Sequence, residues 1–344
     1  MATSAFAEGA GTQSACGGPA VVRSSDLNRD EALLFIINAT SGSHDREDTR
    51  VAIETALAAA GRTGELLFTS PDELASVAVR ASATARARNT AVVAVGGDGT
   101  INAVAQAAHA AGCAMGVVPQ GTFNYFARTH GIPTKTAEAT VALLQAGTVP
   151  VQVGLVNDRV FLVNASLGLY PELLQDREAY KARFGRNRLV AFGAALVTLL
   201  TPHRQLRLRI ESGASVREVI TPTLFIANNR LQLEQVGLPQ ASALDRGCLA
   251  AVTSQPIGAL AMLGLLWRGV LGRLGEAGAV SSFEFQHLVV WPRLPMGRRT
   301  VKVAFDGELV WMRSPVDFRV APEPLNLLKP GPDVPFGDFE AGDA

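Results

Sequence analysis

Residues 96–100 read Gly-Gly-Asp-Gly-Thr and directly follow an apolar run, Ala-Val-Val-Ala-Val. Glycines at the end of a strand let backbone N–H groups approach a phosphate closely. The helix expected to follow points its positive end at the same place. The pattern predicts a phosphate-binding loop that is neither a Rossmann nor a Walker loop. Its expected contacts are Gly96, Gly97, Asp98, Gly99, Thr100 and Asn102.

Asp98 is the unusual member of this loop, because a carboxylate beside phosphates is repulsive. Its presence makes sense if it holds Mg²⁺, directly or through water, or if it braces the loop through hydrogen bonds. The alternative is a tight turn with an aspartate cap. The combination of glycines, an acid and a hydroxyl between a strand and a helix favours the phosphate-binding loop.

A second polar turn, Pro-Gln-Gly-Thr-Phe-Asn, occupies residues 119–124 after another apolar run. Gly121 permits the turn, while Thr122 and Asn124 can bond a nucleotide or phosphate. By itself this is only a Gly-Thr turn before a helix. This turn becomes significant because it lies one β-α unit after the first loop.

A third motif, Asp306-Gly307-Glu308, places two carboxylates around a glycine. Taken alone, the residues favour an Asp-Gly hairpin turn with a solvated glutamate.

Strand and helix patterns alternate four times between residues 33 and 118. This alternation predicts a parallel sheet with helices on its faces, and ligands bind such sheets at the carboxyl ends of the strands. Strand patterns dominate from about residue 150 and predict a second, mostly β domain, interrupted by apolar helical segments at residues 172–200 and 257–271.

These motifs together resemble the catalytic domain shared by diacylglycerol kinases, sphingosine kinases and bacterial lipid kinases. The similarity runs from residue 31 to 321 and includes Gly-Thr-x-Asn-x-x-Ala at residues 121–127. It implies an α/β nucleotide-binding domain with an NAD kinase-like parallel sheet, followed by a mostly β, sandwich-like domain. The expected division is a disordered leader (1–28), an ATP-binding domain (31–152, completed by 316–321), a lipid-substrate domain (153–315) and a loose tail (322–344).

The resemblance implies an ATP- and Mg²⁺-dependent lipid kinase that phosphorylates a hydroxyl such as that of diacylglycerol. Glu308 matches the proton acceptor, with Asp306 beside it as another candidate for that role, and Asp98 joins them as a catalytic residue. Such a base fits, because an alcohol must lose a proton as it attacks the γ-phosphate. Further nucleotide contacts match at Asn38, Ser41, Gly42 and Thr69, although Ala39 replaces the family's proline.

One segment departs from the family pattern. The family often carries Leu-Asp-Asp-Gly, whose second aspartate holds a structural Mg²⁺, whereas this chain has Leu244-Asp245-Arg246-Gly247. A guanidinium cannot ligate a cation. Either the ion is absent, with Arg246 replacing its charge, or Asp245 serves as the ligand.

The expected partner is lipid at a membrane surface. Thirty-one basic residues balance 31 acidic ones, which argues against a nucleic-acid binder. No segment is apolar over the roughly 20 residues that span a bilayer. Basic residues lie just before the apolar run at residues 189–200 and beside residues 265–271, a pattern that suits anionic lipid as well as it suits a solvated turn. These are Lys181, Arg183, Arg186, Arg188, Arg268 and Arg273.

The expected location is the cytoplasm, peripherally on the inner face of the membrane, and a homodimer is kept open. The three cysteines lack metal-ligand spacing and are expected to be reduced thiols. Two other functions are compatible with the motifs: a soluble-metabolite kinase of the NAD kinase type, and a non-catalytic nucleotide- or lipid-binding protein.

Overall fold

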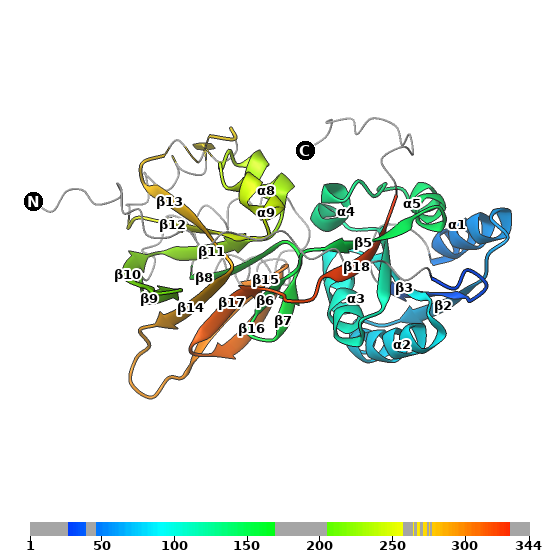
Figure 1. Ribbon diagram of the computed structural model, residues 1–344, viewed down its shortest axis with the longest axis horizontal. Coiled ribbons are helices and arrows are strands. Elements are labelled where there is room, and N and C mark those ends of the chain that lie inside the picture. The colour runs from blue at the N-terminus through cyan, green and yellow to red at the C-terminus, as the bar shows by residue number, and fades with distance from the viewer. Residues whose placement is uncertain are drawn as a thin grey trace, which may run out of the picture.

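The computed structural model describes residues 27–38, 46–168, 205–256 and 277–330, with single positions between 264 and 275. Ser41, Gly42, the leader up to residue 26, basic residues 181–188 and the tail from residue 331 lie outside the described residues. So do all of the predicted helical segment 172–200 and most of segment 257–271. Figure 1 shows two bodies side by side, a helix-covered sheet and a β-rich part.

A six-stranded sheet forms the first domain, in the order β2-β1-β3-β4-β18-β5. The inner strands are apolar along their whole length and almost completely buried, as expected for parallel strands covered on both faces. The strands are β1 (Leu33–Asn38), β2 (Gly64–Thr69), β3 (Ala91–Gly96), β4 (Ala114–Pro119), β5 (Gly147–Val151) and β18 (Leu325–Lys329).

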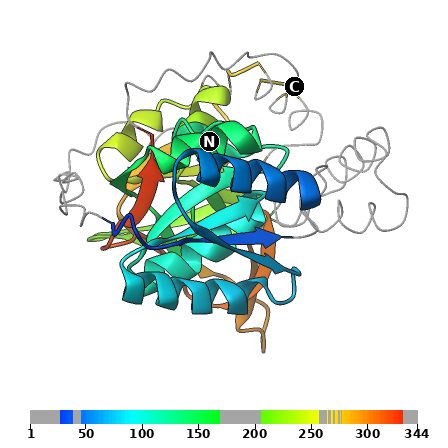
Figure 2. The same ribbon diagram turned by 90° about the vertical axis from the view of Figure 1, so that its right-hand side faces the viewer.

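Helices cover both faces of this sheet, as Figure 2 shows. α2 (Leu74–Arg88) and α3 (Asp98–Ala111) pack together against β1, β3 and β4. α1 (Arg46–Ala59) and α5 (Thr136–Leu144) pack together on the other face. The predicted α/β domain is therefore present.

The sheet differs from the prediction at its far edge. β1 to β4 are parallel, and β18 is parallel to β4, but β5 runs antiparallel to β18. The sheet is therefore mixed rather than entirely parallel.

The strand that completes the first domain also differs from the prediction. Val316–Val320 forms β17, which pairs with β14 and β6 in the second domain, so the expectation that residues 316–321 complete the first domain is wrong. The returning strand is β18, from the segment expected to be a loose tail. Its Leu325 and Leu327 are completely buried in the first domain's core, and this burial outweighs the Pro- and Gly-rich composition around them.

Two six-stranded sheets form the second domain, in the orders β10-β9-β14-β17-β6-β7 and β13-β12-β11-β8-β15-β16. Buried side chains from both sheets, including Phe161, Phe305 and Phe318, form one core, which fits a sandwich. The first sheet contains β6 (Gly154–Val156), β7 (Arg159–Phe161), β9 (Leu206–Ser212), β10 (Ser215–Thr221), β14 (His287–Pro292) and β17 (Val316–Val320). The second contains β8 (Asn164–Gly168), β11 (Thr223–Ala227), β12 (Leu249–Ser254), β13 (Val280–Phe285), β15 (Thr300–Phe305) and β16 (Glu308–Arg313).

Two short helices, α8 (Arg230–Gln235) and α9 (Ala241–Asp245), follow β11 and were not predicted. Asn229 caps α8, because its side chain accepts a hydrogen bond from the Gln232 N–H at 3.0 Å. The Asn229 amide also donates to the Tyr125 carbonyl at 3.2 Å, and Tyr125 begins α4 (Tyr125–Thr129) of the first domain. This hydrogen bond links the two domains.

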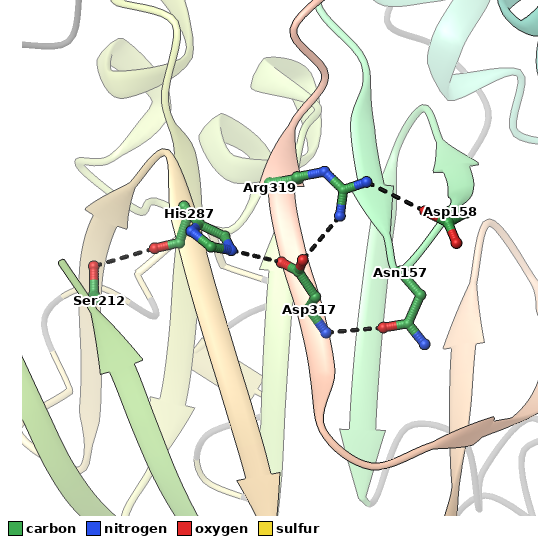
Figure 3. A network of polar contacts seen from close by, with 6 residues as sticks. All are labelled: Asn157, Asp158, Ser212, His287, Asp317 and Arg319. Atoms are coloured by element: carbon green, nitrogen blue, oxygen red, sulfur yellow. Dashed lines mark hydrogen bonds and ion pairs between the residues drawn. The ribbon is translucent and has the colours of Figure 1, made fainter.

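A polar network crosses three strands of the second domain (Figure 3). Asp317 Oδ2 accepts from Arg319 Nη1 at 2.9 Å, and its Oδ1 lies 2.9 Å from His287 Nε2. The Asp317 backbone N–H donates to Asn157 Oδ1. Arg319 also reaches Asp158 at 3.3 Å. The network joins β14 and β17 to the turn between β6 and β7, and so holds the start of β7 in place.

Two further sequence expectations can be compared with the described residues. None of their helices is long and apolar enough to cross a bilayer. Cys113 is a free, buried thiol as predicted.

Candidate active site

The loops after β3 and β4 pack against each other backbone to backbone. A Cβ atom on Gly121 would lie 2.9 Å from the Cα of Gly97, closer than side-chain carbons normally come. The Gln120 N–H also donates to the Gly96 carbonyl at 2.8 Å. The two predicted loops therefore form one continuous surface, at the carboxyl end of the strands and at the start of α3.

Gly121→Ala is expected to separate these loops and to weaken nucleotide binding by at least about tenfold, because the added methyl must displace backbone atoms. Isothermal titration with a non-hydrolysable ATP analogue measures the effect. Gly147→Ala is the matched control, since a Cβ atom there meets nothing within 4 Å. Unchanged affinity in Gly121→Ala would show that the loop contact is dispensable.

Asn124 shapes the second loop with both ends of its side-chain amide. Its Oδ1 accepts from the Gly121 N–H at 2.9 Å, and its Nδ2 donates to the Gly121 carbonyl at 2.8 Å. Its backbone is left-handed, with a φ of 49°, a conformation that asparagine tolerates well. Asn124 is buried and its side-chain amide is bonded to Gly121, whereas Thr122 is exposed on the same loop. Of the two predicted contacts, Thr122 is the side chain open to a ligand.

Asp98 lies between the two loops. Its Oδ2 accepts from the Asn124 N–H at 3.2 Å, while its Oδ1 is buried and has no hydrogen-bond partner among the described residues. Burial raises the pKa of Asp98, against the opposing N–H groups of Asn124 and Tyr125. A buried carboxylate oxygen is the type of ligand that Mg²⁺ takes, so Asp98 could hold the ion, and its metal role stays a prediction.

The remaining predicted nucleotide contacts lie at the ends of neighbouring strands. Asn38 ends β1, where it pairs with Thr69 of β2 and donates to Thr100 Oγ1 at 3.1 Å. Thr69 is buried, and its hydroxyl donates to the Ser70 carbonyl. Asn38 and Thr100 are therefore brought together, whereas the Thr69 hydroxyl is bonded to the backbone carbonyl of the next residue.

Asp306 accepts hydrogen bonds on both carboxylate oxygens. Its Oδ2 takes the Leu162 N–H at 2.6 Å and the Asn102 amide at 2.7 Å. Its Oδ1 takes the N–H groups of Val163 at 2.9 Å and Asn164 at 3.0 Å. Because a carboxylate offers about four acceptor positions, none remains for a substrate hydroxyl. This bonding contradicts the expectation that Asp306 accepts the substrate's proton, and it makes Asp306 a positioning residue.

The side chain of Asn102, like that of Asp306, is held by hydrogen bonds within the protein. Its amide also donates to the Val160 carbonyl at 3.0 Å, so both amide hydrogens are committed to protein acceptors. The prediction that Asn102 contacts the nucleotide through this amide is therefore wrong. Asn102 instead links α3 to the second domain.

Burial raises the pKa of Asp306 to about 6, against the opposing effect of its four donors.

Glu308 follows the Asp306-Gly307 turn and opens β16. Both turn residues have positive φ, 45° and 86°, and Phe305 pairs with Glu308, so the predicted Asp-Gly hairpin is confirmed. The Glu308 side chain is exposed and has no hydrogen bond or ion pair within the described part of the chain. Its carboxylate is therefore free to accept a proton.

Arg159 is a neighbour of Glu308 that the motifs did not indicate. Protein around the carboxylate raises the pKa of Glu308, and the positive charge of Arg159 opposes this shift. Arg159 is exposed at the start of β7, where Val160 is held by α3 through Gln106 Oε1 at 2.7 Å. No sequence signal could have identified Arg159, because its proximity to Glu308 depends on how the two sheets of the second domain meet.

Arg246 occupies the place where the family's structural ion was expected. Its guanidinium pairs with Glu284 and donates to the Ser242 carbonyl at 3.1 Å. A carboxylate and a carbonyl are the oxygen types that would bind a divalent ion, and here they bind a guanidinium. Asp245 pairs with Arg230 at 2.8 Å, so it faces a cation rather than a set of oxygen ligands. These contacts favour replacement of the ion's charge by Arg246.

Part of the chain is similar in sequence to known proteins. Residues 32–156 match the family model "Diacylglycerol kinase catalytic domain". A probable lipid kinase YegS-like of Klebsiella pneumoniae (strain 342) is 35% identical over 117 residues, covering 33% of this chain and 39% of the relative. A probable lipid kinase YegS-like of Pseudomonas aeruginosa (strain UCBPP-PA14) is 35% identical over 144 residues, covering 41% and 45%. The chain thus spans less than half the length of either relative.

The fold has a solved counterpart over almost all of its length. A structure described as a putative diacylglycerol kinase from Bacillus anthracis str. Sterne superposes with a TM-score of 0.67 at 19% identity, covering 88% of this chain and 98% of that one. At this identity the likeness concerns the fold alone. The similarity to the diacylglycerol kinase catalytic domain rests on the matched sequence, residues 32–156, which is about a third of the chain.

Proposed function

We propose that this protein is an ATP-dependent lipid kinase that transfers the γ-phosphate to a lipid hydroxyl, such as that of diacylglycerol. One observation carries the proposal, the 2.7 Å hydrogen bond between Asn102 and Asp306. Asn102 lies one helical turn after Asp98, and Asp306 lies two residues before Glu308. The bond therefore brings a phosphate-binding loop and a free carboxylate to the same domain boundary.

The proposed reaction is an in-line transfer at this boundary. The lipid hydroxyl oxygen forms a bond to the γ-phosphorus of ATP, and the bond from that phosphorus to the bridging oxygen of ADP breaks. Glu308 takes the hydroxyl proton, so that lipid phosphate and ADP leave. The loops around Gly97 and Gly121 hold the phosphates. Mg²⁺ held by Asp98 would neutralise charge on the nucleotide.

The direct test is transfer of labelled γ-phosphate from ATP, in the presence of Mg²⁺, to lipids in mixed detergent micelles. We expect a labelled phospholipid from diacylglycerol or a related lipid alcohol. Absence of label from every lipid of a broad extract would overturn the proposal. Formation of NADP from NAD would instead identify a soluble-metabolite kinase, and ATP binding without transfer would identify a non-catalytic binder.

The pH profile tests the assignment of Glu308 as the base. The protein around the Glu308 carboxylate raises its pKa above 4.5, the ordinary value for glutamate. Because the base must be ionised, the loss of turnover on acidification is expected to set in at a higher pH than an unshifted glutamate would give. Arg159→Met removes a positive charge that lowers this pKa, so the acid limb should move to higher pH. Arg159 is not among the groups that shift the pKa of Asp306, so the shift reports Glu308.

Arg313→Met is the matched control for this profile. Arg313 is exposed at the far end of the same strand, β16, about 16 Å from Glu308 at the usual rise per residue. Its removal should leave the acid limb in place. An acid limb that stays fixed in Arg159→Met, or moves to lower pH, would refute the role of Glu308 as the titrating base.

A further inference from the structure

The connection between β14 and β15 protrudes from one end of the sandwich. It passes from one sheet to the other, and residues 295–300 are all exposed. Figures 1 and 2 both show this orange loop extending beyond the neighbouring strands. Its tip, Met296, is fully exposed. An unbranched apolar side chain at the tip of a protruding loop is costly in water unless it is covered by another apolar phase.

Positive charge surrounds this tip. The Arg293 N–H bonds the Arg207 carbonyl at 2.8 Å, and the Ser314 N–H bonds the Arg299 carbonyl at 2.9 Å, so arginines from separate strands are gathered there. No acidic residue occurs between residues 285 and 305. We call this end of the sandwich the basic end, and define it by Arg207, Arg293, Arg298, Arg299, Lys302 and Arg313.

An exposed aromatic residue adds to the apolar character of the basic end. Trp311 of β16 is 59% exposed, and the Lys302 ammonium lies 5.2 Å from its ring centroid. Tryptophan with adjacent cations is the combination that settles at the boundary between lipid headgroups and acyl chains. A nucleic acid would use the cations but would leave the Met296 tip without a partner.

We infer that the basic end docks on an anionic lipid bilayer, with Met296 and Trp311 entering the headgroup region and the surrounding arginines on lipid phosphates. The inference rests on the proposed function, because a lipid substrate resides in such a bilayer. β16 connects the two places directly, since Glu308 begins the strand and Arg313 ends it. None of the residues that define the basic end belongs to the two apolar segments predicted from sequence.

Vesicle flotation tests this docking surface. The full chain is mixed with neutral phosphatidylcholine vesicles or with vesicles that also contain phosphatidylglycerol. We expect binding to the anionic vesicles alone, weakened by at least about tenfold in the double variant Arg298→Glu with Arg299→Glu. Met296→Ser should weaken binding with no change of charge. The matched control, Arg80→Glu with Arg217→Glu, makes the same charge change at exposed sites elsewhere.

Activity separates this inference from the proposed function. In detergent micelles, where the substrate is dispersed, the loop variants should phosphorylate lipid as the unaltered protein does, and only activity on vesicles should fall. If the unaltered protein transfers no phosphate in micelles, the proposed function fails. If it is active there but the loop variants bind anionic vesicles normally, the docking inference fails. Tight binding of duplex DNA that is insensitive to Met296→Ser would also overturn the docking inference, in favour of a nucleic-acid surface.

Discussion

Replacement of Glu308 by glutamine is expected to lower kcat for lipid phosphorylation by about 10²- to 10⁴-fold, the range that a general base supplies. The amide keeps the size of the side chain but cannot accept the proton of the attacking hydroxyl. Since Glu308 has no hydrogen bond or ion pair within the described part of the chain, the change should leave thermal stability intact. Steady-state kinetics in mixed micelles measures the loss.

Nucleotide affinity gives the internal check on this variant. The phosphate-binding loops lie on the first domain, so titration with an ATP analogue should give an unchanged Kd. Glu218→Gln, an exposed glutamate on β10, is the matched control and should retain full activity. A Glu308→Gln protein with kcat within a few-fold of normal would remove Glu308 from the mechanism and leave the proton without an acceptor at this boundary.

Replacement of Asp306 by alanine is expected to lower the free energy of unfolding by about 3–5 kcal/mol. The reason is that removing the carboxylate leaves its buried hydrogen-bond donors without an acceptor. Backbone N–H groups of Leu162, Val163 and Asn164 lose their acceptor, as does the Asn102 amide. Chemical denaturation measures the change. Asp158→Ala is the control, because that side chain is 98% exposed and should cost little.

Asp306→Asn distinguishes positioning from catalysis at the same site. The amide is isosteric, yet its nitrogen cannot accept from the N–H groups that face it, so stability should fall here too. The molecules that remain folded should still turn over substrate, and their pH profile should keep the acid limb that is set by Glu308. Normal stability combined with complete loss of kcat would instead make Asp306 the base and contradict its assignment as a positioning residue.

Local sequence patterns predicted the parts of the fold that depend on neighbouring residues. The buried run at β3, the glycines after it and the Asp-Gly turn at Asp306 each determine their own backbone, so these elements were predicted correctly. β18 was missed because its burial depends on a gap between β4 and β5 that no nearby residue reveals. The antiparallel edge strand was missed for the same reason.

The candidate site divides in the same way. Asp98, Gly97 and Gly121 lie together as their motifs indicated. Residue type could not reveal that Asn102 and Asp306 bind each other across about 200 residues of chain, or that Arg159 lies near Glu308. Polar side chains that bind a ligand and those that bind distant parts of the protein look identical in a sequence. Only their partners distinguish them.

The position of β18 determines when the protein can fold during its synthesis. Residues 33–151 emerge early from the ribosome, yet their sheet lacks a strand between β4 and β5 until residues 325–329 have also emerged. Until then the apolar surfaces that cover β18 face water, and β5 has no partner to pair with. The nucleotide-binding half therefore completes its core last, although it is made first. Its incomplete sheet stays exposed to water until the whole second domain has been translated.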